Sequence, residues 1–479
     1  MPVEKHLENR DSGSMLYVAG VCAVAALGGL LFGYDTAVIS GAIGFLQKAM
    51  SLNPAMTGWA ASSALLGCII GVALSGVLSD RLGRKKVLIL SAVMFFISAV
   101  GTALPRNLTE FIIYRMIGGV GVGAASITSP MYIAEISPSR IRGRMVSVNQ
   151  LAIVFGILLV YFVNYFIARQ GGEAWNVAVG WRWMFGSEAL PAMLLFLLLL
   201  LVPESPRWLI QRGREEQAAV ILARAGGRVN AARELAEIRE TVSRESGSIR
   251  QLFQPGLRKV LVIGVILAVL QQVTGINVFL YYAPEIFKKL GSGTDAALLQ
   301  TIVIGSANLL FTIIAIWLID RLGRKPLMIL GATGMGVSMF ALGCAAYLQE
   351  TSLWVLVFIL GYTTSFAVSI GPAVWVVLAE IFPNRVRGRA MAIAAVCLWA
   401  ANFVVSQTFP MLNESAWLQA RFHGAAPFWL YGGLCFVTVV FVRVFIPETK
   451  QKSLEEIEKI LFPEILSGDC PGKADRTSG

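Results

Sequence analysis

Twelve long apolar segments constrain the fold of this chain more than any other feature of its sequence. About 20 consecutive apolar residues suffice for a helix to cross the hydrocarbon core of a bilayer. Only 14% of the 479 residues are charged, whereas a soluble protein carries about 25%. The sequence therefore predicts an all-α membrane protein with twelve transmembrane helices, at 16–42, 57–79, 87–104, 110–134, 145–168, 184–202, 259–286, 297–319, 327–348, 353–379, 390–412 and 427–446.

Basic residues are unevenly shared between the loops on the two sides of the predicted bundle. The loops after the second, fourth, eighth and tenth helices hold thirteen Lys and Arg residues, and the loops on the other side hold seven. Because loops rich in Lys and Arg remain in the cytoplasm, this asymmetry predicts that both termini are cytoplasmic. The net charge of +11 then reflects membrane topology, and we expect no nucleic-acid partner.

The chain contains an internal repeat. The sequence DRLGRK occurs at 80–85 and at 320–325, and each copy is followed by a related segment, EISPSRIRGR or EIFPNRVRGR. The matching offsets predict two six-helix halves in the same orientation, a transporter design in which the substrate site lies between the halves. The predicted divisions are a first bundle (1–202), a linker with short amphipathic cytoplasmic helices (203–258), a second bundle (259–446) and a cytoplasmic tail (447–479).

The repeated segments place opposite charges at the same ends of neighbouring helices. Ion pairs between such ends can hold one side of a carrier closed and break when that side opens. A plain topology signal is the simpler interpretation, but the repetition favours a gating role. The candidate gating residues are Asp80, Arg84, Glu135 and Arg142 in the first half and Asp320, Arg324, Glu380 and Arg387 in the second.

Motifs spread over nearly the whole chain carry a family resemblance. Besides the repeats, they are GGLLFGYDTAVISG (28–41), PESPRWL (203–209), QQVTGINVFLYYAPE (271–285), GPAVWVVLAEIFP (371–383) and PETKQKSLEEIE (447–458). Together they resemble the sugar porter family of the major facilitator superfamily. The resemblance implies a monomeric carrier in the inner membrane of a bacterium, without enzyme activity. It would move a monosaccharide, D-xylose or a hexose such as D-glucose, together with a proton by alternating access.

Two charged residues inside the predicted spans are candidates for coupling transport to protons. A rise of about 1.5 Å per residue places Asp35 of the first helix and Arg115 of the fourth at a similar depth, where they can pair. Charges within spans are costly and usually functional, and neither histidine, His6 or His423, lies in a span. The resemblance implies that Asp35 and Arg115 carry the proton cycle and that Glu188 assists. The alternative is a static ion pair in a passive sugar facilitator, a uniporter, since such facilitators of the family also keep the aspartate.

Amide and aromatic side chains in the spans form a candidate sugar site. A carboxamide both donates and accepts hydrogen bonds, as a neutral polyol requires, and aromatic rings pack on the apolar faces of sugars. Thr274-Gly275 and Pro284 predict a broken seventh helix, which exposes backbone at a binding site. The residues that match sugar-contacting positions of the family are Phe32, Gln150, Gln271, Gln272, Asn277, Tyr281, Trp375, Trp399 and Asn402.

Two alternatives stay open at this site. A single buried amide is more often a hydrogen bond between helices, although the three amides of the seventh helix together favour binding. Ile157 and Leu398 stand where xylose carriers of the family have glutamine, so a hexose is as compatible with the sequence as xylose.

Other classes of function lack support in the sequence. A sugar sensor built on a carrier fold is expected to carry long cytoplasmic extensions, and we do not expect that role here. The spans show no nucleophile–base pair or phosphate loop, and the six cysteines have no metal-binding or disulfide spacing. The glycine-rich run 118–123 is interpreted as a packing face between helices rather than a nucleotide site. We therefore expect no enzyme activity, no metal and no cofactor.

Overall fold

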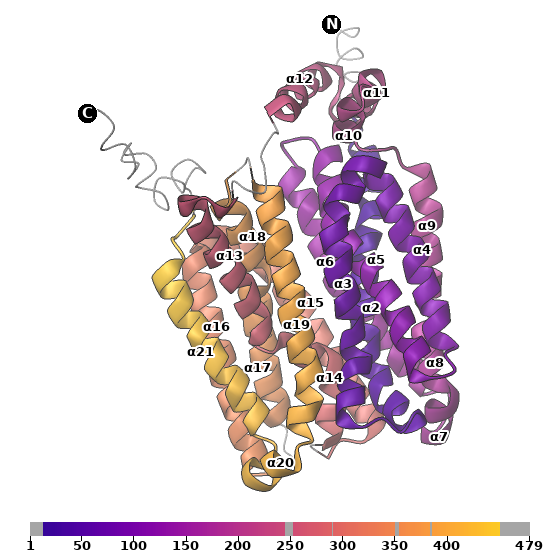
Figure 1. Cartoon of the computed structure of the whole chain (residues 1–479), viewed down its shortest axis with the longest axis vertical. Coiled ribbons are helices and arrows are strands. Elements are labelled where there is room, and N and C mark those ends of the chain that lie inside the picture. Colours follow the sequence, from indigo (N-terminus) through magenta and orange to yellow (C-terminus); the bar gives the residue numbers. More distant parts are fainter. Residues whose placement is uncertain (1–12, 245–251, 290, 350–353, 384–385, 451–479) are drawn as a thin grey trace, which may run out of the picture.

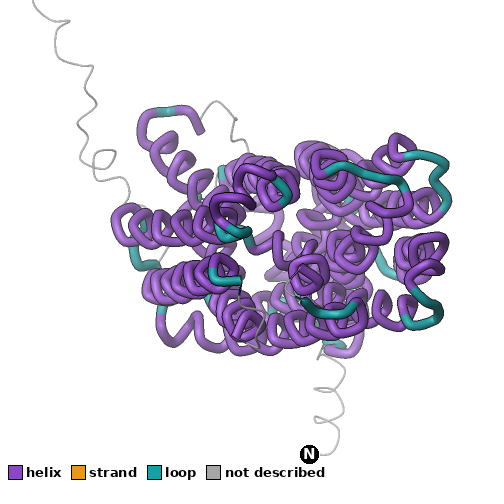
Figure 2. The backbone as a smooth tube through the Cα atoms, turned by 90° about the horizontal axis from the view of Figure 1, so that it is seen from below, coloured by secondary structure: helices purple, strands orange, loops and turns teal. Residues whose placement is uncertain are grey.

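A computed structural model describes residues 13–244, 252–289, 291–349, 354–383 and 386–450. These residues form helices joined by short loops, and none of them lies in a β-strand. Twelve helical segments within them are long and apolar enough to cross a membrane. Figure 1 shows the two groups of helices from the side, and Figure 2 shows them along their length. The predicted fold of twelve spans in two six-helix halves is confirmed.

The first half contains six spans, and the last of them is assembled from short pieces. Its elements are α2 (Met15–Ala49), α3 (Pro54–Leu82), α4 (Arg84–Ala103), α5 (Leu108–Ile136), α6 (Arg142–Ala168), α7 (Glu173–Trp175), the π-helix η1 (Asn176–Gly180), α8 (Trp181–Gly186) and α9 (Ala189–Leu201). Three helices of the linker follow: α10 (Pro206–Gln211), α11 (Glu215–Gly226) and α12 (Arg228–Arg244).

The second half repeats this arrangement with two broken spans. Its elements are α13 (Pro255–Val273), α14 (Ile276–Lys289), α15 (Thr294–Leu322), α16 (Arg324–Tyr347), α17 (Trp354–Val368), α18 (Ile370–Ile381), α19 (Arg387–Asn413), α20 (Ala416–Phe422) and α21 (Ala426–Phe445). The seventh span consists of α13 and α14, and the tenth of α17 and α18. Most of the predicted tail, 451–479, lies outside the described residues.

The linker helices mark one end of the bundle. In Figure 1, α10–α12 lie at the top, whereas α7 and α20 lie at the bottom. We call these the linker end and the far end. The predicted helices of the linker correspond to α11 and α12, and α11 buries an apolar face that includes Ile221 and Leu222. Its last turn meets the start of α2, where the Ser14 amide donates to the Arg224 carbonyl at 2.9 Å. The linker therefore packs on the first half.

Glycine residues let α3 and α5 pack with their backbones almost in contact. A Cβ atom at Gly119 would lie 1.9 Å from the carbonyl oxygen of Ala64, and one at Gly123 would lie 2.3 Å from that of Cys68. No side chain fits at such distances, so only glycine allows this approach. Small residues at helix contacts are typical of membrane bundles. The interpretation of 118–123 as a packing face is confirmed.

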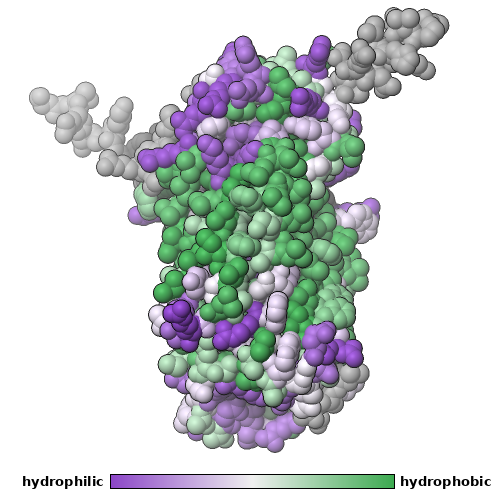
Figure 3. Space-filling view, turned by 90° about the vertical axis from the view of Figure 1, so that its right-hand side faces the viewer, coloured by the Kyte–Doolittle hydropathy of each residue, from purple (hydrophilic) through white to green (hydrophobic). Residues whose placement is uncertain are grey.

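The outer surface of the bundle is apolar, as contact with lipid requires. On α9, the side chains of Leu190 and Leu201 are 80% and 81% exposed. In water, an exposed apolar patch of this extent would cause aggregation. Figure 3 shows one face of the molecule, with apolar surface over its middle and polar residues gathered near the linker helices and toward the far end.

The sixth span begins earlier than its sequence predicted. It starts at Glu173 rather than at 184, and it includes Arg182. The guanidinium group of Arg182 stacks 4.4 Å from the ring centre of Trp181 and donates to the carbonyl oxygens of Ala103 and Pro105 at 3.1 and 3.2 Å. The sequence predicted that Arg182 lies in a loop. Because these contacts compensate its charge, Arg182 can lie within the sixth span instead.

Candidate functional site

A buried ion pair joins the first and fourth spans. Nη1 of Arg115, on α5, lies 2.8 Å from Oδ1 of Asp35, on α2, and also donates to the Asp35 carbonyl oxygen at 3.1 Å. The two residues are 1% and 0% exposed, and the Arg115 guanidinium also lies 5.7 Å from the ring centre of Phe185. The predicted pairing of Asp35 with Arg115 is confirmed. Removing either partner would leave the other charge buried without compensation, which is strongly unfavourable.

Glu188 lies beside this pair. It occupies the break between α8 and α9, it is 1% exposed, and the charges of Asp35 and Arg115 act on its carboxyl group. Oδ2 of Asp35 and Oε1 of Glu188 are buried and have no hydrogen-bond donor among the described residues. Adjacent carboxylates repel each other unless a proton lies between them. The arrangement is therefore suited to take up one proton.

Three amide side chains form a chain of hydrogen bonds at the broken seventh span. Asn277 Nδ2 donates to Gln272 Oε1 at 2.5 Å, and Gln272 Nε2 donates to Gln271 Oε1 at 3.3 Å. Gln271 Nε2 donates in turn to the carbonyl oxygens of Ile370 and Gly371, at 3.1 and 3.0 Å, at the start of α18. The predicted amide cluster is therefore assembled in space and ties the two broken spans of the second half together.

The break itself lies at Thr274 and Gly275, as the sequence predicted. Gly275 has a φ of +92°, a left-handed conformation that glycine adopts without strain. The carbonyl of Thr274 accepts a hydrogen bond of 2.9 Å from the Tyr362 hydroxyl, on α17. Pro284 lies inside α14 and does not end it. The break is therefore made by the glycine and held by a side chain from a neighbouring span.

Aromatic and amide residues of both halves meet next to this cluster. Phe32 of α2 packs on Trp399 of α19, with ring centres 5.5 Å apart and planes inclined by 53°. Tyr281 lies near Asn402, whose Oδ1 accepts from Ser406 at 3.1 Å. Phe32 is three residues from Asp35 on the same helix. A movement of α2 would therefore reach both the ion pair and the Trp399 contact.

Two of the candidate residues stand apart from the hydrogen-bonded set. Gln150 on α6 and Trp375 on α18 are half-buried, and neither side chain is hydrogen-bonded to another described residue. Ile157 and Leu398, which the resemblance places where xylose carriers of the family have glutamine, are both buried. They add apolar surface to a region whose polar groups come mainly from α13 and α14.

Comparison with known proteins identifies the family. A sequence model of the family described as "Sugar (and other) transporter" matches residues 21–461. The chain belongs to this family. It is 49% identical over 476 residues to the D-xylose-proton symporter of Escherichia coli K12, covering 94% of this chain and 96% of that protein. It is also 46% identical to the arabinose-proton symporter of Bacillus subtilis, covering 96% of this chain and 98% of that protein.

The fold is similar to a solved structure of a sugar transporter. The inward-open conformation of the E. coli xylose transporter matches with a TM-score of 0.82 and 46% identity, covering 92% of this chain and 99% of that chain. As a member of the sugar transporter family, the chain is a multi-pass membrane transporter. The resemblance read from its motifs is confirmed.

Charged residues at the linker end of the first half form one cluster around Arg84. Its Nε lies 2.9 Å from Oε2 of Glu135, and its Nη1 lies 3.4 Å from Oδ1 of Asp80. Only 4% of the Arg84 side chain is exposed. The hydroxyl of Ser205 donates to Glu135 as well. The cluster thus links the ends of α3, α4 and α5 to the start of α10.

The second half carries a corresponding ion pair. Arg324 Nη2 lies 3.1 Å from Oε1 of Glu380, which matches Arg84 with Glu135. Arg387 Nε donates to the Phe382 carbonyl at 3.2 Å. The side chain of Asp320 lies outside the described part of the chain. The two repeats therefore place the same arginine–glutamate pair at equivalent helix ends.

One predicted partner of this cluster lies elsewhere. Arg142, at the start of α6, is exposed and forms no ion pair with a described residue. Glu135 is already bound by Arg84 and Ser205, because the turn between α3 and α4 brings Arg84 inward. An ion pair of Arg142 at the helix ends is therefore not formed in this structure.

Two glutamates that the sequence analysis left without a role complete the clusters. Glu204 Oε1 accepts from the Lys85 amide at 3.0 Å, and Glu448 accepts from the amides of Arg324 and Lys325 at 3.2 and 3.1 Å. Each glutamate therefore caps the first turn of a helix, where a negative charge is favourable. The signal was present in the sequence, because Pro-Glu-Ser and Pro-Glu-Thr follow the sixth and twelfth spans.

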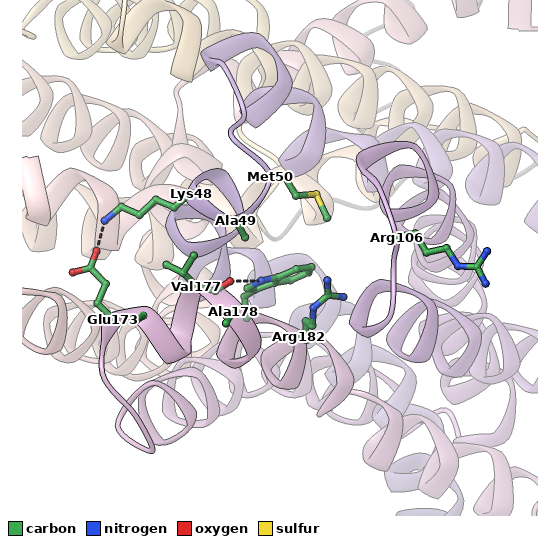
Figure 4. A pocket seen from close by; sticks show the side chains of 10 residues that line it. Lys48, Ala49, Met50, Arg106, Glu173, Val177, Ala178 and Arg182 are labelled. Carbon is green, nitrogen blue, oxygen red and sulfur yellow. Dashed lines mark hydrogen bonds and ion pairs between the residues drawn. The ribbon is translucent and has the colours of Figure 1, made fainter.

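A cavity of about 570 Å³ lies away from the candidate site, at the far end of the first half. Its walls come from the end of α2, from η1 and α8, and from the loop before α5, and Figure 4 shows Lys48 paired with Glu173 at its edge. It contains none of the residues predicted to bind sugar or protons. We therefore place the site by its hydrogen-bonded side chains and not by this cavity.

Proposed function

We propose that this protein is a proton-coupled monosaccharide symporter that works by alternating access. The proposal depends on the buried group of Asp35, Arg115 and Glu188. On α2, Asp35 lies three residues from Phe32, which contacts Trp399 of the second half. A carrier that couples sugar to protons needs one ionisable group whose partner changes during the cycle. Asp35 is that group in the proposal, and Arg115 is its partner when no proton is bound.

The coupling step follows from the cost of buried charge. While Arg115 contacts Asp35, the carboxylate is compensated. If a movement of α2 or α5 separates the two, the uncompensated carboxylate gains stability by binding a proton. Glu188, held at the same place, offers a second oxygen to that proton. Proton binding and helix movement are then two parts of one event.

The sugar would bind between the halves, next to the amides of the seventh span. Gln271, Gln272 and Asn277 supply donors and acceptors, and Tyr281 with Asn402 extends the polar surface. The rings of Phe32, Trp375 and Trp399 would pack on the sugar's apolar faces, and Gln150 would add a polar contact from the first half. Because Ile157 and Leu398 are apolar, D-xylose and a hexose such as D-glucose are both candidates.

Alternating access requires contacts that hold one end closed at a time. Gln407 of α19 accepts from Ser62 at 2.9 Å and donates to the Ala55 carbonyl at 3.0 Å, both on α3. Tyr161 of α6 donates to the Leu280 carbonyl at 2.8 Å. These bonds join the halves toward the far end. We infer that the far end is closed here and that it faces the outside, with the linker end and both termini in the cytoplasm.

In this proposal the gating role of the charge clusters at the linker end is to keep each half rigid, because each pair joins helix ends of one half and is formed while the far end is closed. The pairs of Arg84 with Glu135 and of Arg324 with Glu380 hold the helix ends of each half in a fixed arrangement. Rigid halves transmit a movement at the centre to both ends. In this proposal the protein acts as a monomer, with the divisions at 202, 258 and 446 separating the moving halves from the linker and tail.

The test measures the pH of the medium in a weakly buffered suspension of energy-depleted cells that express the protein. D-xylose, D-glucose, D-galactose and L-arabinose are added in turn, to wild type and to Asp35→Asn. A sugar that enters with protons makes the medium alkaline, and Asp35→Asn should abolish this change while labelled sugar still exchanges. If labelled sugar crosses without any pH change in wild type, the protein is a passive facilitator and the proposal is wrong.

A further inference from the structure

The sixth span is weakened at the position of Glu188. Pro191 has no amide hydrogen, so it cannot donate to the Ser187 carbonyl four residues earlier. Leu190 donates to that carbonyl instead, at 3.4 Å, and the Glu188 amide reaches only Phe185, at 3.3 Å. Two regular bonds of an α-helix, from residue 188 to Met184 and from residue 191 to Ser187, are therefore replaced or missing, while Ser187 still donates to Trp183 at 2.9 Å and Ala192 to Glu188 at 3.1 Å. The break is thus held by fewer backbone bonds than a continuous helix, and side-chain bonds can add to its stability.

A hydroxyl pair supplies that support. The Ser187 hydroxyl donates to the Met184 carbonyl at 2.6 Å, the group that the Glu188 amide would bind in a regular helix. The oxygens of Tyr34 and Ser187 lie 2.7 Å apart. Because the only hydrogen of the Ser187 hydroxyl is used on Met184, Tyr34 is the donor of this bond. Tyr34 is 2% exposed, so its bond is shielded from water.

These two residues are the immediate neighbours of the two carboxyl groups. Tyr34 precedes Asp35 on α2, and Ser187 precedes Glu188 at the break. The ionisable groups that act on the Glu188 carboxyl, among the described residues, are Asp35 and Tyr34 of α2 and Arg115 of α5. Oε1 of Glu188 has no donor of its own. No described donor holds this oxygen, so the backbone of Glu188 contributes strongly to where the carboxyl group lies.

We propose that Tyr34 and Ser187 are positioning residues for proton coupling: their hydroxyl bond fixes the break between α8 and α9 on α2 and so sets the separation of the Glu188 and Asp35 carboxyl groups. The inference rests on the proposed function, because it assumes that these carboxyl groups bind the transported proton. Without the bond, the break is free to move away from α2. A proton that both carboxyl groups share would then be held less tightly.

The experiment compares Tyr34→Phe and Ser187→Ala with wild type in two assays. The first is sugar uptake as a function of external pH, and the second is exchange of labelled sugar with equal sugar on both sides, which needs no net proton movement. The pH of half-maximal uptake should fall by about half a pH unit, the size set by the net free energy of one hydrogen bond. The exchange rate should stay within about twofold of wild type, because the sugar contacts are unchanged.

Controls separate this role from a general loss of packing. Tyr132→Phe removes another buried hydroxyl bond of the first half, to the Pro203 carbonyl at 2.5 Å, and should leave the pH profile unchanged. Ser187→Thr keeps the hydroxyl and should restore the wild-type profile. The double variant Tyr34→Phe/Ser187→Ala should shift no further than the larger single shift, because both changes remove the same bond.

Each outcome decides the question. If Tyr34→Phe and Ser187→Ala keep the wild-type pH profile, or if Tyr132→Phe shifts it equally, the inference is wrong. Should Tyr34→Phe fail to accumulate in the membrane, the comparison of Ser187→Ala with Ser187→Thr gives the same test. Wild-type uptake that does not depend on pH contradicts the proposed function itself, and that result is visible before any variant is measured.

Discussion

Replacing Gly58 by leucine should hold the far end of this transporter open. Gly58 lies on α3 against the backbone of α19, and a Cβ atom there would be 2.4 Å from the carbonyl oxygen of Gln407. Ordinary contacts between a carbon atom and a neighbouring heavy atom lie at about 3.5 Å, so the two helices must separate by about 1 Å for the first side-chain atom alone. The obstruction is a backbone atom of the opposite half, which no rotamer change can remove.

The size of the shift between the two states depends on the conformation in which the clash occurs. Overpacking a well-packed contact costs about 1–3 kcal/mol. The clash exists only while the far end is closed, because Gly58 and Gln407 belong to different halves. The whole cost therefore shifts the balance between the two states, by about 5- to 150-fold at 1.4 kcal/mol per factor of ten. Gly76 is a matched control, because it lies on the same helix and a Cβ atom there meets nothing within 4 Å.

The assay measures how fast a thiol in the contact between the halves reacts with a membrane-impermeant reagent. Ser62→Cys, in a background without the native cysteines, places the thiol next to Gln407. In intact cells, Gly58→Leu should accelerate labelling at least fivefold and slow sugar exchange, whereas Gly76→Leu should change neither. Equal labelling rates in wild type and Gly58→Leu, with normal exchange, would show that the halves do not meet here in the working protein.

Two further predictions concern the amide cluster and the helix caps. Gln272→Leu should raise the sugar concentration for half-maximal binding by about tenfold or more, because Asn277 and the sugar both lose the amide oxygen of Gln272 as an acceptor. Titration of the tryptophan fluorescence with sugar measures this concentration. An unchanged affinity would show that the seventh span is not part of the sugar site. Glu204→Gln and Glu448→Gln should each lower the melting temperature of the purified protein by weakening a charge-assisted cap worth about 1 kcal/mol. Since the caps lie in different halves, their effects should add to within about 0.5 kcal/mol, and a strongly non-additive double variant would contradict their independence.

The sequence predicted the parts of the fold that depend on local chemistry. Apolar length is enough to find a span, and helical rise is enough to place Asp35 and Arg115 at one depth, so their pairing was predictable. The break at Thr274-Gly275 was predictable for a similar reason, since a glycine between apolar runs allows a backbone conformation that other residues resist. In each case the cause lies within a few residues of its effect.

The sequence could not identify partners that come from another element. It offers both Arg84 and Arg142 near Glu135, and in this structure the turn between α3 and α4 brings Arg84 to it. The sequence places Arg182 in a loop before the sixth span, whereas two carbonyl groups at the end of α4 and in the loop after it accept its hydrogen bonds and keep it in the span. The support of Glu188 by Tyr34 and Ser187 was likewise invisible, because a hydroxyl group in an apolar span carries no signal of its partner.

The bonds between the halves have a consequence for how the protein tolerates variation. Gln407 and Tyr161 direct their donors to the backbone carbonyls of Ala55 and Leu280, not to side chains. A carbonyl is present whatever residue occupies the position, so substitution at Ala55 or Leu280 leaves these acceptors in place. An alanine scan of the far end would therefore detect only one member of each pair. The contacts at Ala55 and Leu280 therefore depend only on the side chains of Gln407 and Tyr161, whereas the bond of Ser62 with Gln407 needs a side chain from each half.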